Sequence, residues 1–209
     1  MTSPAYIALE GLEGCGKSTH TKRLAEHLDA VMTREPGGTR IGGLLRAILA
    51  DPENTDLAPR TEALLMAADR AQHMAEVIQP ALARGQHVVS DRSIYSTLAY
   101  QGYGRRLGTP DLLNISTWAL DGRLPDMVVF ISVPTPILNE RLAKRNLDRF
   151  EREGAGGAKF TRIDVGSTFG VGSQWQVNTE FRGRPRRFVV KLNEFAPSER
   201  MVFETGSSK

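Results

Sequence analysis

Short apolar runs alternate with segments of helical periodicity over the first 145 residues of the chain. The runs predict buried strands, and the longest of them, 127–133, predicts a strand that is buried on both faces. Between the runs, apolar residues recur at the spacing of amphipathic helices. We therefore expect strands at 5–9, 30–33, 87–90 and 127–133, and helices at 19–28, 41–50, 60–84, 110–120 and 134–145. This alternation favours an α/β fold, a parallel sheet flanked by helices.

The pattern changes after residue 153. Gly154–Ala158 contains only glycine and alanine, which indicates a flexible joint. Beyond it, large and polar residues alternate at 175–181, and short apolar runs follow at 188–192 and 201–204. This spacing predicts an antiparallel β meander. We therefore expect two domains, 1–153 and 154–209, with the chemistry in the first.

The segment Gly11–Ser18 has two glycines separated by four residues and followed by lysine and serine, the pattern of a phosphate-binding loop. It lies between an expected strand and an expected helix, which favours this interpretation over a glycine-rich turn with an exposed lysine and serine. Glycines permit positive φ, so that backbone N–H groups can point at phosphate oxygens. Lys17 should reach the β- and γ-phosphates, and the Ser18 hydroxyl should hold Mg²⁺. The predicted ATP-binding residues are Gly11, Leu12, Glu13, Gly14, Cys15, Gly16, Lys17, Ser18 and Thr19.

Two charged residues, Asp91 and Arg92, directly follow the expected strand 87–90. The carboxyl ends of strands are where α/β sheets present their ligand-binding residues. Asp91 could hold Mg²⁺ through water or orient an acceptor phosphate, and the planar fork of Arg92 suits a phosphate. The alternative is a surface pair that caps the following helix.

Composition adds limits. The 209 residues are 40% hydrophobic and 24% charged, as in soluble globular proteins. The net charge is only +3 and the basic clusters suit phosphates, so we expect no nucleic-acid partner. Apolar runs fall short of the roughly 18 residues that cross a bilayer, and the start of the chain lacks a basic secretory signal, so a cytoplasmic protein without a membrane partner is expected. Cys15 is the only cysteine and can form no disulfide within the chain.

Several segments resemble those of the bacterial thymidylate kinase family. They are the phosphate loop with its acidic residue, TREPGGT at 33–39, AADRAQH at 67–73, DR at 91–92, STLAYQG at 96–102, and the basic stretch 141–151 that ends in DRFE. The resemblance covers residues 5–153 and implies a P-loop kinase fold. It also implies transfer of the γ-phosphoryl group from MgATP to dTMP, giving dTDP, in a homodimer.

The resemblance implies roles for single residues. Arg70 would contact the thymine ring, and Tyr100 would pack against C2′ of the sugar and leave no room for a ribose hydroxyl. Arg141, Arg145 and Arg149, which lie in the basic stretch 141–151, would form a lid that closes over the triphosphate. The predicted catalytic residues are Lys17, Asp91, Arg92, Arg141, Arg145 and Arg149. The predicted substrate-binding residues are Glu13, Arg34, Met66, Arg70, Arg92, Ser96, Tyr100 and Gln101, and the predicted metal-binding residues are Glu13, Ser18 and Asp91.

The chain departs from the family pattern at two places. Met66 stands where the family usually has an aromatic residue that stacks on thymine, and its softer side chain predicts weaker base affinity or selectivity. After residue 153, the sequence shows no pattern of four elements that follow in the family. These are a long helix, the last sheet strand, the loop that holds adenine and the last helix. Residues 158–205 instead resemble a fragment of the START-like polyketide cyclase and lipid-binding superfamily, as a chimeric tail would.

Three alternative functions therefore remain open besides that of a thymidylate kinase. The replaced tail favours a nucleotide-binding chimera with impaired catalysis, or a small-molecule-binding protein. If Tyr100 leaves room for a ribose 2′-hydroxyl, the protein would be a nucleoside monophosphate kinase of broader specificity. Charge-rich helix ends are usually solvated, which is the alternative for the stretch 141–151.

Overall fold

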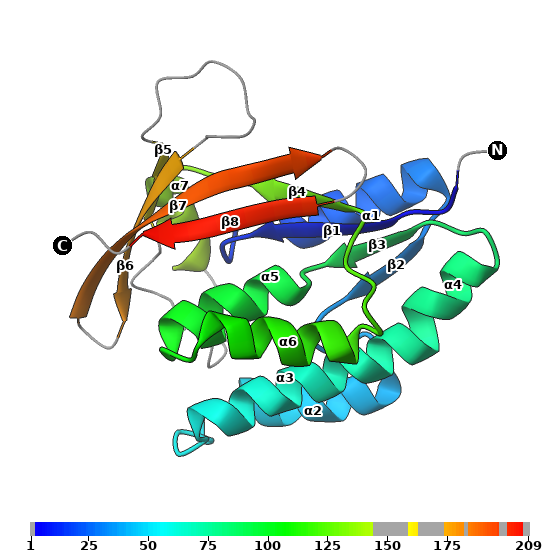
Figure 1. Cartoon of the computed structure of the whole chain (residues 1–209), viewed down its shortest axis with the longest axis horizontal. Helices are drawn as coiled ribbons and strands as arrows, with labels where there is room; N and C mark the ends of the chain where they lie inside the picture. Colours follow the sequence, from blue (N-terminus) through cyan, green and yellow to red (C-terminus); the bar gives the residue numbers. More distant parts are fainter. Residues whose placement is uncertain (1–2, 144–158, 163–173, 182–183, 197–199, 207–209) are drawn as a thin grey trace.

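The structure, a computed structural model, describes residues 3–143, 159–162, 174–181, 184–196 and 200–206. The first range folds as a parallel sheet with helices on both faces, which confirms the predicted α/β class (Figure 1). The strand order is β2-β3-β1-β4, and each neighbouring pair runs parallel. The strands are β1 Tyr6–Gly11, β2 Val31–Arg34, β3 Val88–Asp91 and β4 Met127–Ile131.

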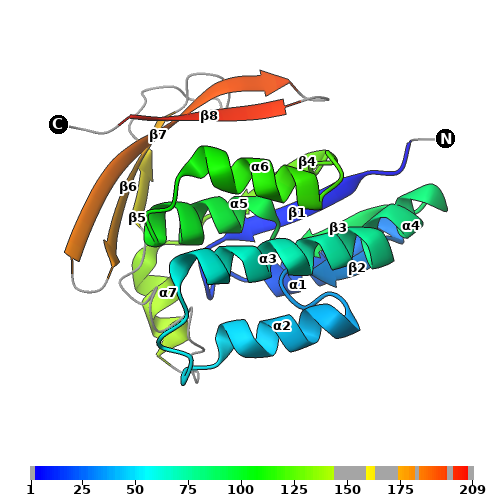
Figure 2. The same cartoon turned by 60° about the horizontal axis from the view of Figure 1, so that its bottom comes forward.

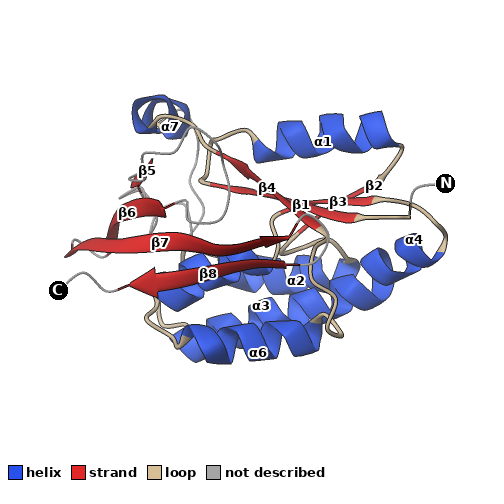
Figure 3. Cartoon of the chain, turned by 45° about the horizontal axis from the view of Figure 1, so that its top comes forward, coloured by secondary structure: helices blue, strands red, loops and turns tan. Residues whose placement is uncertain are grey.

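Helices connect these strands, with α1 on one face of the sheet and α3 and α6 on the other (Figure 3). The predicted helix 60–84 is divided into three segments, because Pro80 has no N–H to donate and the hydrogen-bond spacing lengthens to a π turn just before it. The described helices include none long and apolar enough to cross a bilayer. The helical segments are α1 Lys17–Leu28, α2 Arg40–Ala50, α3 Pro59–His73, the π turn η1 Met74–Ile78, α4 Gln79–Ala83, α5 Ile94–Thr97, the π turn η2 Leu98–Gly104, α6 Thr109–Ala119 and α7 Thr135–Leu142.

Two apolar cores lie on opposite faces of the sheet, because successive side chains of a strand point to opposite sides. Ile7 and Leu9 of β1 pack with Val89 of β3 against α1. Tyr6 and the neighbouring Val88 face the other way, into a larger core. That core also contains Met74, Ile78, Ala81, Leu82, Ile94 and Leu120. The sheet is thus anchored on both sides, and its strand ends are held in fixed positions.

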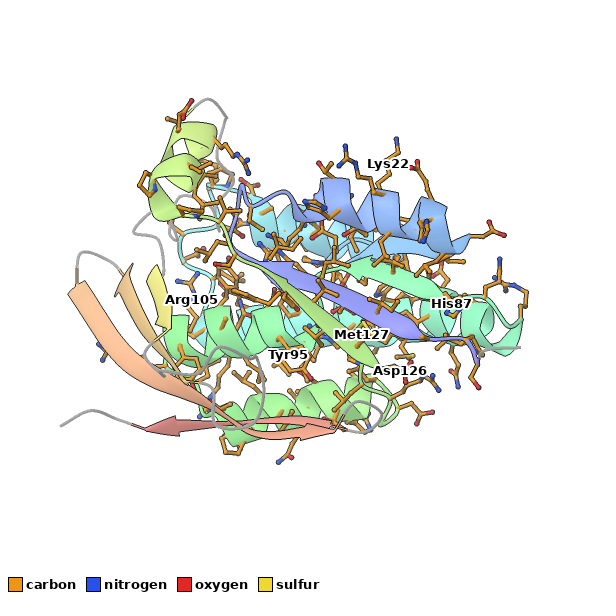
Figure 4. The ribbon with its side chains drawn as sticks, turned by 90° about the horizontal axis from the view of Figure 1, so that it is seen from above. Lys22, His87, Tyr95, Arg105, Asp126 and Met127 are labelled. Atoms are coloured by element: carbon orange, nitrogen blue, oxygen red, sulfur yellow. The ribbon has the colours of Figure 1, made fainter. Side chains whose placement is uncertain are left out.

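The prediction of a fully buried strand at 127–133 is wrong. Strand β4 ends at Ile131 and occupies the edge of the sheet order, next to β1. Met127, labelled in Figure 4, is 55% exposed and Phe130 is 51% exposed. An apolar run predicts a strand, but its burial depends on which element packs beside it, and that information is not local.

Four strands of the tail form a separate antiparallel sheet with the order β5-β6-β7-β8 (Figures 1 and 2). This confirms the predicted meander. The predicted joint 154–158 lies outside the described residues. The strands are β5 Lys159–Arg162, β6 Gln174–Phe181, β7 Arg184–Ala196 and β8 Arg200–Gly206.

The carboxyl ends of the parallel strands meet at one edge of the sheet. The register pairs Gly11 with Ile131 and Arg34 with Asp91. The loop after β1 and the segments that follow β2 and β3 therefore converge there, and most of the sequence-predicted site residues lie in these segments.

Candidate active site

The loop between β1 and α1 is shaped by its glycines. Gly14 has φ 77° and Gly16 has φ 96°, values that side chains other than glycine rarely adopt. A Cβ added to Gly11 would lie 2.5 Å from the carbonyl oxygen of Ile131, so a side chain does not fit there either. Gly16 directly precedes α1, whose positive dipole end consequently faces the loop. This arrangement can hold a phosphate chain.

Lys17 lies folded against its own loop. Its side chain is buried, and Nζ donates to the carbonyl oxygens of Gly11 at 2.9 Å and Leu12 at 2.7 Å. Burial, and next the positive charge of Arg92, lower the pKa of Lys17. A bound phosphate would supply the negative partner that favours the charged ammonium.

Ser18 and Asp91 meet across the sheet edge. Ser18 Oγ donates to Asp91 Oδ2 at 2.5 Å, which joins the first turn of α1 to the end of β3. Hydroxyl and carboxylate oxygens are ligands that Mg²⁺ accepts, and this ion usually completes its shell with water and substrate phosphates. The pair therefore fits a magnesium site. Glu13, the third predicted metal ligand, is engaged elsewhere.

Glu13 is bound to Arg92 and Tyr100. One carboxylate oxygen accepts from Arg92 Nη2, and the other accepts from the Tyr100 hydroxyl at 2.5 Å. Burial would raise the pKa of Glu13, but the positive charges of Arg92 and Lys17 and the hydrogen bond from Tyr100 together outweigh it, and the pKa is lowered. The guanidinium carbon of Arg92 also lies 5.4 Å from the centre of the Tyr100 ring. Three predicted substrate-binding residues thus form one cluster.

Arg92 is held in a strained conformation. Its φ of 74° is unfavourable for a long side chain, and such strain gathers at functional sites. Burial would lower the pKa of Arg92, but Tyr100 and the carboxylates of Glu13 and Glu10 raise it. The guanidinium therefore stays charged, ready for a phosphate.

Glu10 supports this cluster and was missed by the sequence analysis. It is 5% exposed and accepts from Ser93 N and Oγ, each at 2.8 Å, and from Ser96 Oγ at 2.7 Å. Ser96 in turn accepts from Arg92 Nη1 at 2.9 Å. Burial raises the pKa of Glu10, against the effect of Arg92. The available signal was a glutamate directly after the expected strand 5–9, at the end of a strand where α/β sheets present ligand-binding residues.

Arg70 lies in a second buried cluster. Its Nε donates to Glu35 Oε2 at 2.9 Å, its Nη1 to Ser116 at 3.2 Å and its Nη2 to Thr97 at 3.0 Å. Glu35 Oε1 lies 3.0 Å from Nδ1 of His73. Burial would raise the pKa of Glu35, but the charge of Arg70 and the contact with His73 lower it. Glu35 and His73 lie in segments that carry the family resemblance, but no role was predicted for either residue.

An open cleft of about 900 Å³ joins the two clusters to the loop. Gly11, Leu12 and Cys15 do not line it, and Arg145 and Arg149 lie outside the described residues. Arg141 does line it, and its Nη1 donates to the carbonyl oxygen of Gly14 at 2.9 Å. The predicted site residues that line the cleft are Glu13, Gly14, Gly16, Lys17, Ser18, Thr19, Arg34, Met66, Arg70, Asp91, Arg92, Ser96, Tyr100, Gln101 and Arg141.

Gln101 contributes an unsatisfied acceptor. Its Nε2 donates to Glu62 Oε1 at 2.7 Å, whereas its Oε1 is buried without a hydrogen-bond partner among the described residues. A buried acceptor without a donor costs about 1–3 kcal/mol. Gln101 lines the cleft, so a ligand donor that reaches this buried oxygen would remove the cost.

The glycine loop, its lysine and the Ser18–Asp91 pair define a P-loop protein with a cleft for phosphorylated ligands. The thymidylate kinase family model matches residues 9–163, and the chain belongs to that family. It is 46% identical to a thymidylate kinase of Alkalilimnicola ehrlichii over 173 residues, 79% of each chain. A thymidylate kinase of Geotalea uraniireducens is 39% identical over 207 residues, 97% of this chain and 89% of the relative. The crystal structure of thymidylate kinase from Ehrlichia chaffeensis matches with a TM-score of 0.60 and 33% identity, over 67% of this chain and 82% of that one.

Proposed function

We propose that this chain transfers the γ-phosphoryl group of ATP to dTMP, giving dTDP. The observation that carries the proposal is the shared cleft, in which the phosphate loop around Lys17 faces the cluster of Arg92 and Tyr100. Donor and acceptor phosphates can thus approach one another without leaving the site. Membership of the thymidylate kinase family supports the same reaction.

The donor side binds ATP through its phosphates. Backbone N–H groups of the loop and the start of α1 would hold the β- and γ-phosphates, and Lys17 would exchange its bonds to the loop carbonyls for phosphate oxygens. Ser18 and Asp91 would hold Mg²⁺, which supplies positive charge to the phosphates when it is bound. Catalysis is then positioning and charge neutralisation.

The acceptor side binds the dTMP phosphate through Arg92. Its guanidinium already lies between Glu13 and Ser96, so its fork is oriented before the substrate arrives. Tyr100 is anchored by its hydroxyl on Glu13, which fixes the ring that would exclude a ribose 2′-hydroxyl. Arg141, which contacts Gly14, would stabilise the transferring group, and we propose the same role for Arg145 and Arg149.

The thymine base lies between Met66 and Gln101 in this proposal. Both residues line the cleft, as does Arg70. The unpaired Oε1 of Gln101 would accept from N3–H of thymine, the donor that cytosine lacks. Methionine provides a polarizable face for the ring in place of an aromatic side chain.

We further propose a homodimer. Large apolar side chains are exposed on the adjacent helices α2 and α3: Leu44 at 58%, Ile48 at 46% and Leu64 at 55%. A second copy would cover them. Sedimentation equilibrium should give twice the mass of one chain, and substitution of Leu44 and Leu64 by glutamate should shift it to one.

We assign the chemistry to domain 1–153 and propose that the tail, 154–209, contributes little to it. A chain that ends at Gly154 should then fold and phosphorylate dTMP nearly as well as the full chain. If the shorter chain fails to fold, the strands of the tail are instead essential for the fold. Because the substrates are cytoplasmic nucleotides, we propose a cytoplasmic enzyme.

An acceptor panel tests the proposed function. With ATP and Mg²⁺ in excess, turnover of dTMP should exceed that of dUMP, UMP and AMP. Equal turnover of UMP and dTMP would contradict the proposed exclusion of the ribose 2′-hydroxyl by Tyr100. It would favour a nucleoside monophosphate kinase of broader specificity. Nucleotide binding without turnover of any acceptor would favour the impaired chimera.

A further inference from the structure

Glu62 lies behind Gln101 and does not line the cleft. It is 1% exposed, in the first turn of α3. Its Oε1 accepts from Gln101 Nε2 at 2.7 Å and from Arg105 Nε at 3.1 Å, and its Oε2 accepts from Arg105 Nη2 at 2.9 Å. Arg105, labelled in Figure 4, directly follows η2, the segment that carries Gln101. The carboxylate therefore ties α3 to the segment that contains the candidate base contact.

A glutamine amide has a donor end and an acceptor end, and it can present either to a ligand. An ionised carboxylate can only accept, so Glu62 requires the NH₂ end of Gln101. The two hydrogen bonds from Arg105 favour the ionised carboxylate. The carbonyl end of Gln101 is consequently left as the unpaired acceptor, and the amide cannot turn over without placing its oxygen against the oxygen of Glu62.

We propose that Glu62, held by Arg105, is a positioning residue that sets base selectivity by fixing the Gln101 carbonyl toward the acceptor base. This inference rests on the proposed function. Thymine presents a donor at N3, which the fixed carbonyl accepts. Cytosine presents an acceptor at N3, so that two acceptors would face one another in a buried site. The hydrogen bond between Glu62 and Gln101 would then cause the rejection of dCMP, although Glu62 itself touches no substrate.

The substitution Glu62→Gln tests the inference, because glutamine has nearly the same shape but can also donate. The Gln101 amide can then take either orientation. If half of the molecules hold each one, kcat/KM for dTMP falls about twofold. For dCMP the repulsion is relieved in half of the molecules, and kcat/KM rises at least about tenfold. The measured quantity is the ratio of kcat/KM for dTMP to that for dCMP.

Glu76→Gln is a matched control. Glu76 also accepts from a glutamine amide, Gln72 Nε2 at 2.8 Å, but on the exposed surface. The selectivity ratio should not change in this variant. Thermal unfolding of each variant separates a loss of folded protein from a change in selectivity.

The exchange Glu62→Gln with Gln101→Glu provides the rescue. The amide introduced at position 62 would donate to one oxygen of the carboxylate introduced at position 101, and the other oxygen of that carboxylate would offer an acceptor to the base. Selectivity for dTMP over dCMP should return to within about threefold of the original ratio, because the acceptor no longer depends on an amide orientation. Should Glu62→Gln fail to fold, this double variant decides the question by the same ratio.

Equal losses for dTMP and dCMP in Glu62→Gln would overturn the inference, since Glu62 would then be only structural. A double variant without preference for dTMP would overturn it as well. Neither result affects the proposed function, which is decided in the unmodified protein. If the unmodified protein fails to turn over dTMP, the proposed function is wrong before any variant is compared.

Discussion

Replacing Glu35 by glutamine should destabilise the protein strongly. The Glu35 side chain is 4% exposed and that of Arg70 is 2% exposed, and their charged atoms lie 2.9 Å apart. Removal of one partner leaves a buried charge without compensation, which costs roughly 3–5 kcal/mol. For a chain of this size each kcal/mol corresponds to roughly 2–4 °C, so the unfolding midpoint should fall by roughly 6–20 °C. Urea unfolding followed by circular dichroism, at constant slope, measures the free energy directly.

The control for Glu35→Gln is a glutamate whose ion pair is on the surface. Glu26 lies 3.8 Å from Lys22, with a side chain that is 63% exposed, and Glu26→Gln should change stability by less than about 1 kcal/mol. Adding Arg70→Met to Glu35→Gln should recover part of the loss, because no buried charge then remains unpaired. The reasoning is refuted if Glu35→Gln costs no more than Glu26→Gln.

Three further predictions concern the phosphates and pH. Lys17→Met should lower kcat by at least about 100-fold, with little change in dTMP affinity by calorimetry. Asp91→Asn should raise the Mg²⁺ concentration for half-maximal turnover by about 10–100-fold, measured by titration at saturating ATP. The lowered pKa values of Glu13 and Glu35 contribute stability that is present above their ordinary value of 4.5 and lost as pH falls through the lowered values, so urea midpoints should decline below about pH 4.5. Unchanged midpoints down to pH 3 would contradict that last prediction.

The order of strands and helices and the glycine loop could be predicted because they follow from local patterns. Glycine spacing specifies the positive φ of Gly14 and Gly16, and apolar runs specify the strands beside them. The grouping of Asp91 with the loop followed from topology, since parallel strands end at one edge. Most predicted site residues consequently line one cleft.

Contacts between distant residues could not be predicted. Glu10 and Ser93 are 83 positions apart, and Glu35 and Arg70 are 35 apart, so nothing in either segment indicates the partner. The contacts of Glu13 could not be predicted for the same reason: an acidic residue in the loop suits a metal, and nothing near it in the sequence indicates that Arg92 and Tyr100 bind its carboxylate. The exposure of Phe130 depends on what lies beside β4, which an apolar run does not encode.

The most direct test follows the phosphoryl group itself. ATP labelled at the γ-phosphate is incubated with the protein, Mg²⁺ and dTMP, and the products are separated by chromatography. The label should appear in the β-phosphate of dTDP, in amounts equal to the ADP formed. Label that appears as inorganic phosphate, or that remains in ATP while dTMP is unchanged, would contradict transfer between the loop at Lys17 and the acceptor cluster at Arg92.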